Sequence, residues 1–449
     1  MMNADLIQKY NVPAPRYTSY PPVPFWNNEL SHENWPRLFQ KAYHEFGEEG
    51  ISLYIHLPYC ESLCTYCGCN KRITKNHQVE LPYISAIVKE WNLYLDMLRD
   101  KPKLAGIHLG GGTPTFFSPA SLSMMLRHIL STSTVAETAE FSFEGHPNNT
   151  TYEHLAVLNG FGFDRVSYGI QDFNPKVQVA IHRIQPYKKV EEATSNAREI
   201  GYKSINYDLI YGLPHQTLKT LKDTIAKVNT LRPDRIAFYS YAHLPTVFPS
   251  QRSFEKHLPN EREKRELYEN GKLWLSQMGY YDIGMDHFAL QRDPLFKAKE
   301  TKTLHRNFMG YTTSPSKILI GLGCSAISDL YYAYGQNEKH VEDYKTAITD
   351  SQLPLIKGHT LNQEDILMKK LIMDLICNGE ADWTPNLTPL PEPVADKLTE
   401  FKNEGLLDFC ERGIRVNEHG KTFIRNICMA IDPYFQTPAH AKPVFSKSI

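Results

Sequence analysis

The chain has 449 residues, of which 41% are hydrophobic and 22% charged, a composition typical of a globular protein with one large domain and room for a smaller one. Its 49 lysines and arginines nearly balance its 50 aspartates and glutamates, so it lacks the basic excess of a nucleic-acid-binding protein. No apolar run approaches the roughly 18 residues of a membrane helix, and the first residues do not resemble a secretory signal. We therefore expect a cytoplasmic protein with reduced cysteines and with no nucleic-acid or membrane partner.

Residues 1–45 are rich in proline and tyrosine and show no clear period, which predicts an extended N-terminal arm laid over the body of the protein. From residue 46 to 355, strand-like and helix-like segments alternate, so this stretch forms the main α/β domain. Strands are predicted at 51–57, 104–109, 140–144, 165–171, 204–210, 235–241 and 281–285. Helices between them include 82–99, 118–130, 218–231 and 260–278.

Strands that alternate with helices at this spacing form parallel βαβ units. The first six strands therefore predict an open doubly wound sheet or a full or partial βα barrel, and periodicity does not choose between them. Both architectures place functional residues at the C-terminal ends of the strands.

Residues 356–449 follow a different pattern, with helices predicted at 363–377 and 391–404, a hairpin at 406–416 and a last helix at 421–429. The order helix, helix, hairpin resembles a winged-helix outline. We therefore predict a small, mostly helical C-terminal domain, and we interpret it as a lid on the substrate site.

Four of the eight cysteines fall within ten residues, directly after the first predicted strand: Cys60, Cys64, Cys67 and Cys69. In a reducing compartment such a group indicates metal binding rather than disulfides, and thiolates suit iron–sulfur clusters or zinc. A structural zinc ion takes four ligands, usually as two spaced pairs, and Cys67 and Cys69 make a poor pair. Three thiolates on a four-iron cluster would leave one iron open to a further ligand. The spacing Cys-x3-Cys-x2-Cys therefore favours a cluster held by Cys60, Cys64 and Cys67.

This spacing resembles the radical S-adenosylmethionine superfamily. The longer segments Tyr-Ile-His-Leu-Pro-Tyr-Cys at 54–60 and Cys-Thr-Tyr-Cys-Gly-Cys-Asn-Lys at 64–71 resemble one branch of it, the oxygen-independent coproporphyrinogen III oxidases of heme biosynthesis. The likeness extends over nearly the whole chain, through segments 15–21, 110–115, 169–173, 208–214, 241–245, 305–308 and 425–428.

The resemblance implies a partial (β/α)6-type radical SAM barrel that binds a [4Fe–4S] cluster and S-adenosylmethionine. It implies that a 5′-deoxyadenosyl radical drives the oxidative decarboxylation of two propionates of coproporphyrinogen III, giving protoporphyrinogen IX. The reaction needs an electron donor of the flavodoxin or ferredoxin type and an electron acceptor. Because no amphipathic dimer stripe is evident, we expect a monomer.

The C-terminal ends of the predicted strands should deliver their side chains to one rim, and tandem glycines at 110–112 let the backbone approach a ligand closely. The resemblance assigns ten residues to the S-adenosylmethionine site: Tyr54, Gly111, Gly112, Thr113, Glu144, Gln171, Arg183, Asp208, Ala242 and Ile327. Arg183 is expected to bind a carboxylate with its guanidinium fork. Three further arginines in family-like segments are candidates for substrate propionates: Arg16, Arg252 and Arg306.

Some positions need separate comment, because they differ from the family pattern or have no assigned role in it. Cys69 matches this branch, whose members use only three cysteines, so we expect it not to bind the cluster. His146 and His182 stand where the family more often has acidic or amide residues, which affects the expected polar surroundings of S-adenosylmethionine. No residue is assigned as a catalytic acid or base.

Two other functions remain open from the sequence. Related radical S-adenosylmethionine proteins act as heme chaperones, but they typically carry Phe at the position of Cys69 and lack the Arg-Asn-x-Cys segment found at 425–428. A zinc-bearing nucleic-acid binder would use the winged-helix-like end, but phosphate binding needs a basic face, which the balanced charge does not favour.

Overall fold

The structure, a computed structural model, describes residues 4–26, 30, 33–383, 391–436, 445 and 447. The predicted arm and C-terminal domain also include residues outside this set: 1–3, 27–29, 31–32, 384–390, 437–444, 446 and 448–449. None of the helices within the described ranges is long and apolar enough to cross a membrane.

A twelve-stranded sheet runs through the described part of the chain, in the order β16-β15-β14-β13-β1-β4-β5-β6-β7-β8-β10-β9. Its six central parallel strands are β1 (Ile51–Leu57), β4 (Lys103–Gly111), β5 (Thr134–Gly145), β6 (Arg165–Gln171), β7 (Ser204–Tyr211) and β8 (Arg235–Ser240). The sheet has two free ends and does not close. The predicted partial (β/α)6 barrel is therefore confirmed, and each of the six predicted strands is present.

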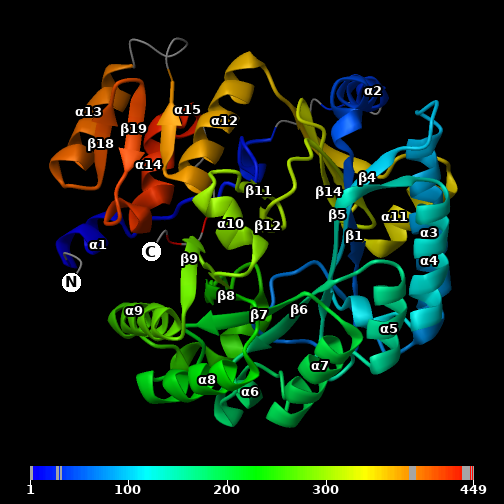
Figure 1. Cartoon of the computed structure of the whole chain (residues 1–449), viewed down its shortest axis with the longest axis horizontal. Helices are drawn as coiled ribbons and strands as arrows, with labels where there is room; N and C mark the ends of the chain where they lie inside the picture. The colour runs from blue at the N-terminus through cyan, green and yellow to red at the C-terminus, as the bar shows by residue number, and fades with distance from the viewer. Residues whose placement is uncertain are drawn as a thin grey trace.

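Helices cover the outer face of these strands (Figure 1). In chain order they are α3 (Glu80–Leu95), α4 (Pro119–Ser131), α5 (Tyr152–Gly160), α6 (Pro175–Ala180), α7 (Tyr187–Ile200), α8 (Leu218–Leu231) and α9 (Glu261–Gln277). The outward side chains of the strands and the inward side chains of the helices share one hydrophobic core. Alternate residues of the same strands, which face inward, are mostly polar and surround a cavity.

The sheet extends beyond the predicted barrel on both sides. β13 (Ile318–Leu322) pairs in parallel with β1 and is followed by the antiparallel strands β14 (Ile327–Asp329), β15 (Ala333–Asn337) and β16 (Leu355–Thr360), with α11 (Val341–Thr349) between the last two. At the other end lie β9 (Tyr280–Gly284) and β10 (His287–Leu290), then α10 (Pro294–Glu300) and the small hairpin β11 (His305–Asn307) and β12 (Gly310–Thr312). Because β16 ends at residue 360, the large sheet crosses the predicted domain boundary at 355.

The N-terminal residues differ from the predicted extended arm, because they contain α1 (Ala4–Tyr10) and α2 (Asn34–Phe46). Trp35, Phe39, Ala42 and Phe46 form a buried stripe on α2 at helical spacing, which explains why this segment is helical. The described residues between the two helices are largely irregular, as expected, apart from the 3-10 helix Val23–Phe25. Tyr10, Tyr17 and Tyr20 pack into the hydrophobic cluster of the C-terminal domain.

The C-terminal domain contains α12 (Gln363–Asn378), α13 (Glu392–Asn403), α14 (Ile424–Ile431) and α15 (Pro433–Gln436) around a three-stranded sheet. The strands are β17 (Glu380–Asp382), β18 (Leu407–Cys410) and β19 (Gly413–Val416), and β18 and β19 form the predicted hairpin. In Figure 1 this domain lies beside α10 and the β11–β12 hairpin, with α1 beneath it.

Candidate active site

The cysteine loop follows β1 at the C-terminal edge of the barrel. Its two ends pair as β2 (Tyr59–Cys60) and β3 (Arg72–Ile73). Cys60, Cys64 and Cys67 are all half-buried and free of disulfides. The Cys60 sulfur lies 3.3 Å from Thr113 Oγ1, and Arg183 Nη1 donates to the Cys64 sulfur at 3.5 Å. The loop therefore joins the ends of β1, β4 and the segment after β6.

The donor set and its surroundings fit a thiolate-bound cluster. The pKa of Cys67 is lowered to about 6, chiefly because the Cys69 thiol donates a hydrogen bond to it and because Lys71 is near, whereas burial raises the pKa of Cys60 to about 11. Across the described ranges, no three His, Cys, Asp or Glu side chains are arranged to hold a single metal ion. Thiols that are too spread for one ion suit a polynuclear [4Fe–4S] cluster better than zinc.

Glycine is required where the end of β4 meets the end of β1. Gly111 has a φ of +114°, and a Cβ atom there would lie 2.8 Å from the His56 ring. A Cβ atom on Gly112 would lie 2.4 Å from the Pro58 carbonyl oxygen. The Thr113 N–H donates to the Tyr59 carbonyl at 3.0 Å. The half-buried backbone at 111–113 therefore packs directly against the cysteine loop, as only glycine allows at Gly111 and Gly112.

Tyr54, His108 and Glu144 form a group on the inner side of this edge. The Tyr54 ring stacks on His108 with centroids 6.0 Å apart, and the Tyr54 hydroxyl lies 3.0 Å from His56 Nδ1. Glu144 Oε2 accepts the Gly111 N–H at 3.2 Å. The side chain of Glu144 is still 45% exposed, so this carboxylate has free capacity to accept hydrogen bonds from an ammonium group or a sugar hydroxyl.

Asp208 lies two strands further along the same inner surface. It accepts hydrogen bonds from Asn206 at 2.8 Å and from Ser167 at 3.3 Å. Burial, and then the negative charge of Glu144, raise the pKa of this carboxyl to about 7. The two predicted carboxylates thus line one shared cavity.

Gln171 and Arg183 lie next to each other at the end of β6. Gln171 has a φ of +65°, and its buried Oε1 has no hydrogen-bond partner among the described residues. Arg183 donates to the Gly169 carbonyl from Nη2 at 2.6 Å and from Nε at 3.2 Å, besides its contact with Cys64. The predicted guanidinium fork is therefore engaged by the protein itself, and it sits against the cysteine loop.

The remaining predicted cofactor residues lie on the same edge. Ala242, just after β8, is exposed, and its carbonyl accepts from Gln251 at 3.3 Å. Ile327 is the first residue of β14 and packs closely against Gly321, where a Cβ atom would lie 2.6 Å from the Ile327 carbonyl oxygen. Gly321 is paired with Tyr54 of β1, so Ile327 lies near Tyr54. The structure thus brings all ten predicted residues to the C-terminal edge of the barrel or its continuation into β14.

The two unusual histidines lie in different environments. The pKa of His146 is lowered to about 3, by burial and then by the nearby Arg183, so this ring is neutral. His182 has a φ of +51° and is exposed on the outer surface. Of the two, His146 therefore shares the surroundings of the predicted cofactor residues.

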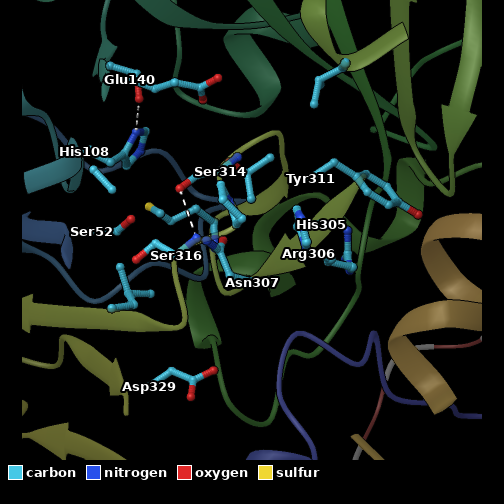
Figure 2. A pocket seen from close by; sticks show the side chains of 18 of the residues that line it. Ser52, His108, Glu140, His305, Arg306, Asn307, Tyr311, Ser314, Ser316 and Asp329 are labelled. Carbon is cyan, nitrogen blue, oxygen red and sulfur yellow. Dashed lines mark hydrogen bonds between the residues drawn. The ribbon is translucent and has the colours of Figure 1, made fainter. Parts of the chain in front are cut away.

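A cavity of about 580 Å³ fills the barrel interior below this edge. In Figure 2 the side chains of Ser52 and His108 lie across it from Arg306 and Tyr311. Arg306 stands over the Tyr311 ring at 4.7 Å, and its buried Nε and Nη1 atoms have no hydrogen-bond partner in the described structure. His287 also lines the cavity; burial and the charge of Arg306 lower its pKa to about 4. The cavity therefore ends on a half-buried cation that has no ion-pair partner among the described residues.

The other two candidate arginines lie elsewhere. Arg16 pairs with Asp286 and stands 5.7 Å from the Tyr239 ring, in a second cavity of about 250 Å³ on the far side of Tyr311. Arg252 is exposed on the 3-10 helix Pro249–His257 and lines neither cavity. The structure thus places Arg306 in the main cavity, Arg16 beside it and Arg252 outside it.

Sequence reasoning missed several residues that line the main cavity, among them Ser167, Asn206, Tyr239, His287 and Tyr311. For Ser167 and Asn206 a signal was available, because a polar residue at alternate positions of an otherwise apolar central strand indicates a polar inner face. His287 and Tyr311 lie in short strands whose direction the sequence does not reveal.

Comparison with known proteins identifies the family of this chain. A family model of the Radical SAM superfamily matches residues 54–228. The chain is 37% identical to the oxygen-independent coproporphyrinogen III oxidase of Escherichia coli over 99% of this chain and 98% of that protein. It is also 37% identical to the enzyme of that name from Helicobacter pylori, over 95% of this chain and 96% of the relative.

The solved coproporphyrinogen III oxidase of Escherichia coli, described as a radical SAM enzyme, superposes with a TM-score of 0.88 and 35% identity, over 97% of this chain and 99% of that one. The family implies a [4Fe–4S] cluster and S-adenosylmethionine as cofactors, as the sequence predicted. The chain therefore belongs to the oxygen-independent coproporphyrinogen III oxidases of the radical SAM superfamily.

Proposed function

We propose that this protein catalyses the oxygen-independent oxidative decarboxylation of two propionate side chains of coproporphyrinogen III, giving protoporphyrinogen IX. The observation that carries the proposal is the cavity of about 580 Å³ that joins the cofactor edge of the barrel to Arg306, two of whose guanidinium nitrogens are buried without a partner among the described residues. A substrate with several carboxylates suits such a cavity, and relatives similar over their full length bear the name of this activity.

Cys60, Cys64 and Cys67 would hold the [4Fe–4S] cluster, and the edge residues would hold S-adenosylmethionine beside it. When bound, these cofactors supply a carbon radical that takes a hydrogen atom from the substrate. The protein's part is to position the reactants and to exclude water.

Two side chains on the inner edge, Glu144 and Asp208, have the chemistry to orient S-adenosylmethionine. Glu144 is held by the Gly111 N–H and keeps free acceptor capacity, so it suits an ammonium group or a ribose hydroxyl. Asp208 is oriented by Asn206 and Ser167 and serves as a second acceptor. The other predicted residues of this edge complete the cofactor site.

Arg306 is the propionate ligand that the geometry favours. Its unpaired Nε and Nη1 groups can each donate to a carboxylate, and a charge-assisted bond of this kind contributes about 1.5–3 kcal/mol. Arg16 lies next to the cavity across Tyr239 and Tyr311 and is a second candidate. Arg252 would reach the substrate only if the segment that carries it moved.

The C-terminal domain acts as a lid in this proposal. Ile366, Lys369 and Met373 of α12 line the main cavity, which places this domain in its wall. We keep a division into an N-terminal segment, a barrel and a lid, with helices in the N-terminal segment and with the end of the barrel sheet at residue 360 rather than 355.

The finer features are part of the same proposal. Each decarboxylation removes a hydrogen atom, a carbon dioxide and one further electron from the propionate, so an electron acceptor is required besides the donor. We propose a flavodoxin- or ferredoxin-type donor and a monomeric cytoplasmic protein that needs neither nucleic acid nor membrane. The near-neutral net charge of −1 is consistent with the absence of a nucleic-acid partner.

Anaerobic turnover tests the proposal. The reconstituted protein is mixed with coproporphyrinogen III, S-adenosylmethionine and dithionite, and the products are followed by mass spectrometry. Stepwise loss of two carboxyl groups, with 5′-deoxyadenosine formed, is expected. A loaded cluster that cleaves S-adenosylmethionine and leaves the porphyrinogen intact would contradict the oxidase and favour a heme chaperone.

A further inference from the structure

A shallow hollow lies on the outer surface of the barrel, separate from both cavities. Lys176, Val179, His182, His215 and His257 line it. These residues come from α6, from the loop that follows it, from the loop before α8 and from the 3-10 helix Pro249–His257. The sites described above use none of them.

The elements around the hollow also hold the cysteine loop. The Thr65 N–H, between Cys64 and Cys67, donates to the Ile181 carbonyl at 3.1 Å. On the other side, Ser250 donates to the Thr65 carbonyl at 2.9 Å and Gln251 donates to the Tyr66 carbonyl at 3.2 Å. The backbone between two of the three cysteines is thus bound directly to the two segments that form the hollow.

A small hydrophobic cluster forms the floor beneath. Val177, Leu213 and Phe254 are buried in it, and Tyr66 of the cysteine loop packs against it. This cluster is separate from the main core of the barrel. The hollow and the cysteine loop therefore share one packed support.

Val179 lines the hollow, and other exposed apolar side chains belong to the segments next to it or to the cysteine loop. Val179 is 59% exposed and Ile184 63% exposed, and Val247, just before the 3-10 helix, is 57% exposed. Leu63 of the cysteine loop and Leu218 at the start of α8 are exposed as well. Exposed apolar groups that gather on one surface mark interaction sites.

The charge around these apolar groups is positive. Lys176 lines the hollow, and Arg252 and Lys256 are exposed on the 3-10 helix beside it; Glu255, 3.1 Å from His243, is the one carboxylate of that helix. The pKa of His215 is lowered by burial and by the nearby Lys176 and His257, which is the effect of a positive local field. The chain as a whole carries a net charge of −1, so this surface is a local exception.

We propose that this surface, formed by α6, the loop before α8 and the 3-10 helix Pro249–His257, docks an acidic one-electron carrier protein that reduces the cluster. The inference rests on the proposed function, because a cluster in the cysteine loop needs an external electron. One electron leaves the reduced carrier, which is oxidised, and enters the cluster, which is reduced, and no atom is transferred. Small interfaces with complementary charge are typical of transient electron-transfer complexes.

A charge-reversal variant tests this surface, with reduced flavodoxin as the acidic probe. Lys176→Glu/Lys256→Glu is compared with Lys101→Glu, an exposed lysine just before β4 on the opposite edge of the barrel. The readout is the rate at which flavodoxin bleaches the cluster absorbance of the loaded protein, without coproporphyrinogen. At low salt we expect the double variant to be slower by roughly ten-fold or more, because electrostatic steering of this size depends on complementary charge.

Several measurements distinguish docking at this surface from a general effect of charge and from a defect in the cluster itself. The difference in flavodoxin reaction rate between the double variant and the unaltered protein should shrink as salt is raised. Lys101→Glu should react with flavodoxin as fast as the unaltered protein. Dithionite should reduce all three proteins at the same rate. Val179→Asp should slow the flavodoxin reaction at every salt concentration. An unchanged flavodoxin rate in the double variant, or an equal loss in Lys101→Glu, would overturn the proposal.

A dimer that dissociates in Val179→Asp would assign the surface to a second copy of the chain and would also overturn it. Turnover with dithionite reports on the proposed function independently. If that turnover fails in the unaltered protein, the function is wrong; if only flavodoxin-driven reduction is insensitive to these variants, the docking surface is wrong.

Discussion

The outward and inward faces of the same parallel strands differ in both polarity and packing. Outward residues are almost completely buried against the helices: Leu109, Phe143, Tyr168, Leu209 and Phe238. Their inward neighbours line the cavity: His108, Glu144, Ser167, Asp208 and Tyr239. Consecutive residues of one strand therefore face a hydrophobic core on one side and a polar cavity on the other. The difference teaches that the outer face provides stability, whereas the inner face is built to bind.

Some polar groups of the barrel interior lower the stability of the protein because they have no hydrogen-bond partner, and a bound ligand can supply one. Gln171 Oε1 and two nitrogens of Arg306 are buried without partners among the described residues. Each unmet polar group of this kind costs about 1–3 kcal/mol. The comparison between the two faces leads to four predictions, from the largest expected effect to the smallest.

Cys64→Ala, at the mouth of the inner face, should abolish cluster binding and turnover, because two thiolates do not hold the cluster. The cluster-free protein should keep its melting temperature, since Cys64 is half-buried and lies outside the hydrophobic cores. Iron content, cluster absorbance and thermal unfolding measure the two effects. Cys410→Ala, at an exposed cysteine of the C-terminal hairpin, is the matched control. Retention of cluster and turnover in Cys64→Ala would exclude this cysteine as a ligand.

Leu209→Ala, on the outer face, should lower the free energy of unfolding by about 2–5 kcal/mol, because it leaves a cavity in the core. Asp208→Asn, at the adjacent inward position, should not destabilise the cofactor-free protein at neutral pH. Chemical denaturation of both variants measures the difference. Equal destabilisation by the two substitutions would remove the distinction between the faces.

Arg306→Gln should raise the KM for coproporphyrinogen by roughly ten-fold or more, through the loss of a charge-assisted hydrogen bond. Cleavage of S-adenosylmethionine without substrate should be unchanged. Arg252→Gln is the control, because this exposed side chain lines neither cavity, and dithionite is the reductant so that donor docking does not matter. A larger effect in Arg252→Gln would mean that its segment folds over the bound substrate.

The smallest effect concerns pH. Burial, and then Glu144, raise the pKa of Asp208 to about 7 in the folded protein, above its value near 4 in the unfolded chain. Between these values the folded state holds a proton that the unfolded state has lost, so this group lowers stability as pH rises. The melting temperature of Asp208→Asn relative to the unaltered protein should therefore increase from pH 5 to pH 8, by on the order of a few degrees. A constant difference across this range would show that the carboxyl is not buried as described.

The barrel and the cofactor edge were predictable because their signals are local. Each of the six strands is bounded by turn residues, and Cys60, Cys64 and Cys67 come from one short loop. The strands β13 to β16 were not predicted, because β13 pairs with β1 more than 260 residues earlier and nothing local marks that partner. The helical spacing of Trp35 and Phe39 indicates α2, but the prolines earlier in this segment favoured an extended arm.

The substrate side was harder to predict than the cofactor side. Arg306 and Arg252 both stand in family-like segments, yet Arg306 is half-buried and lines the cavity, whereas Arg252 is exposed outside it. Their difference depends on how the β11–β12 hairpin and the 3-10 helix pack, which is decided by distant residues. His287 was missed for the same reason, since its strand is placed by its pairing with β8.

Transfer of a labelled hydrogen tests the central claim most directly. Coproporphyrinogen III carrying deuterium at the propionate β-carbons is turned over anaerobically, and the 5′-deoxyadenosine formed is examined by mass spectrometry. The account predicts one deuterium in 5′-deoxyadenosine for each propionate converted to a vinyl group. Vinyl formation with unlabelled 5′-deoxyadenosine would contradict it, because the hydrogen would then leave the substrate by another route.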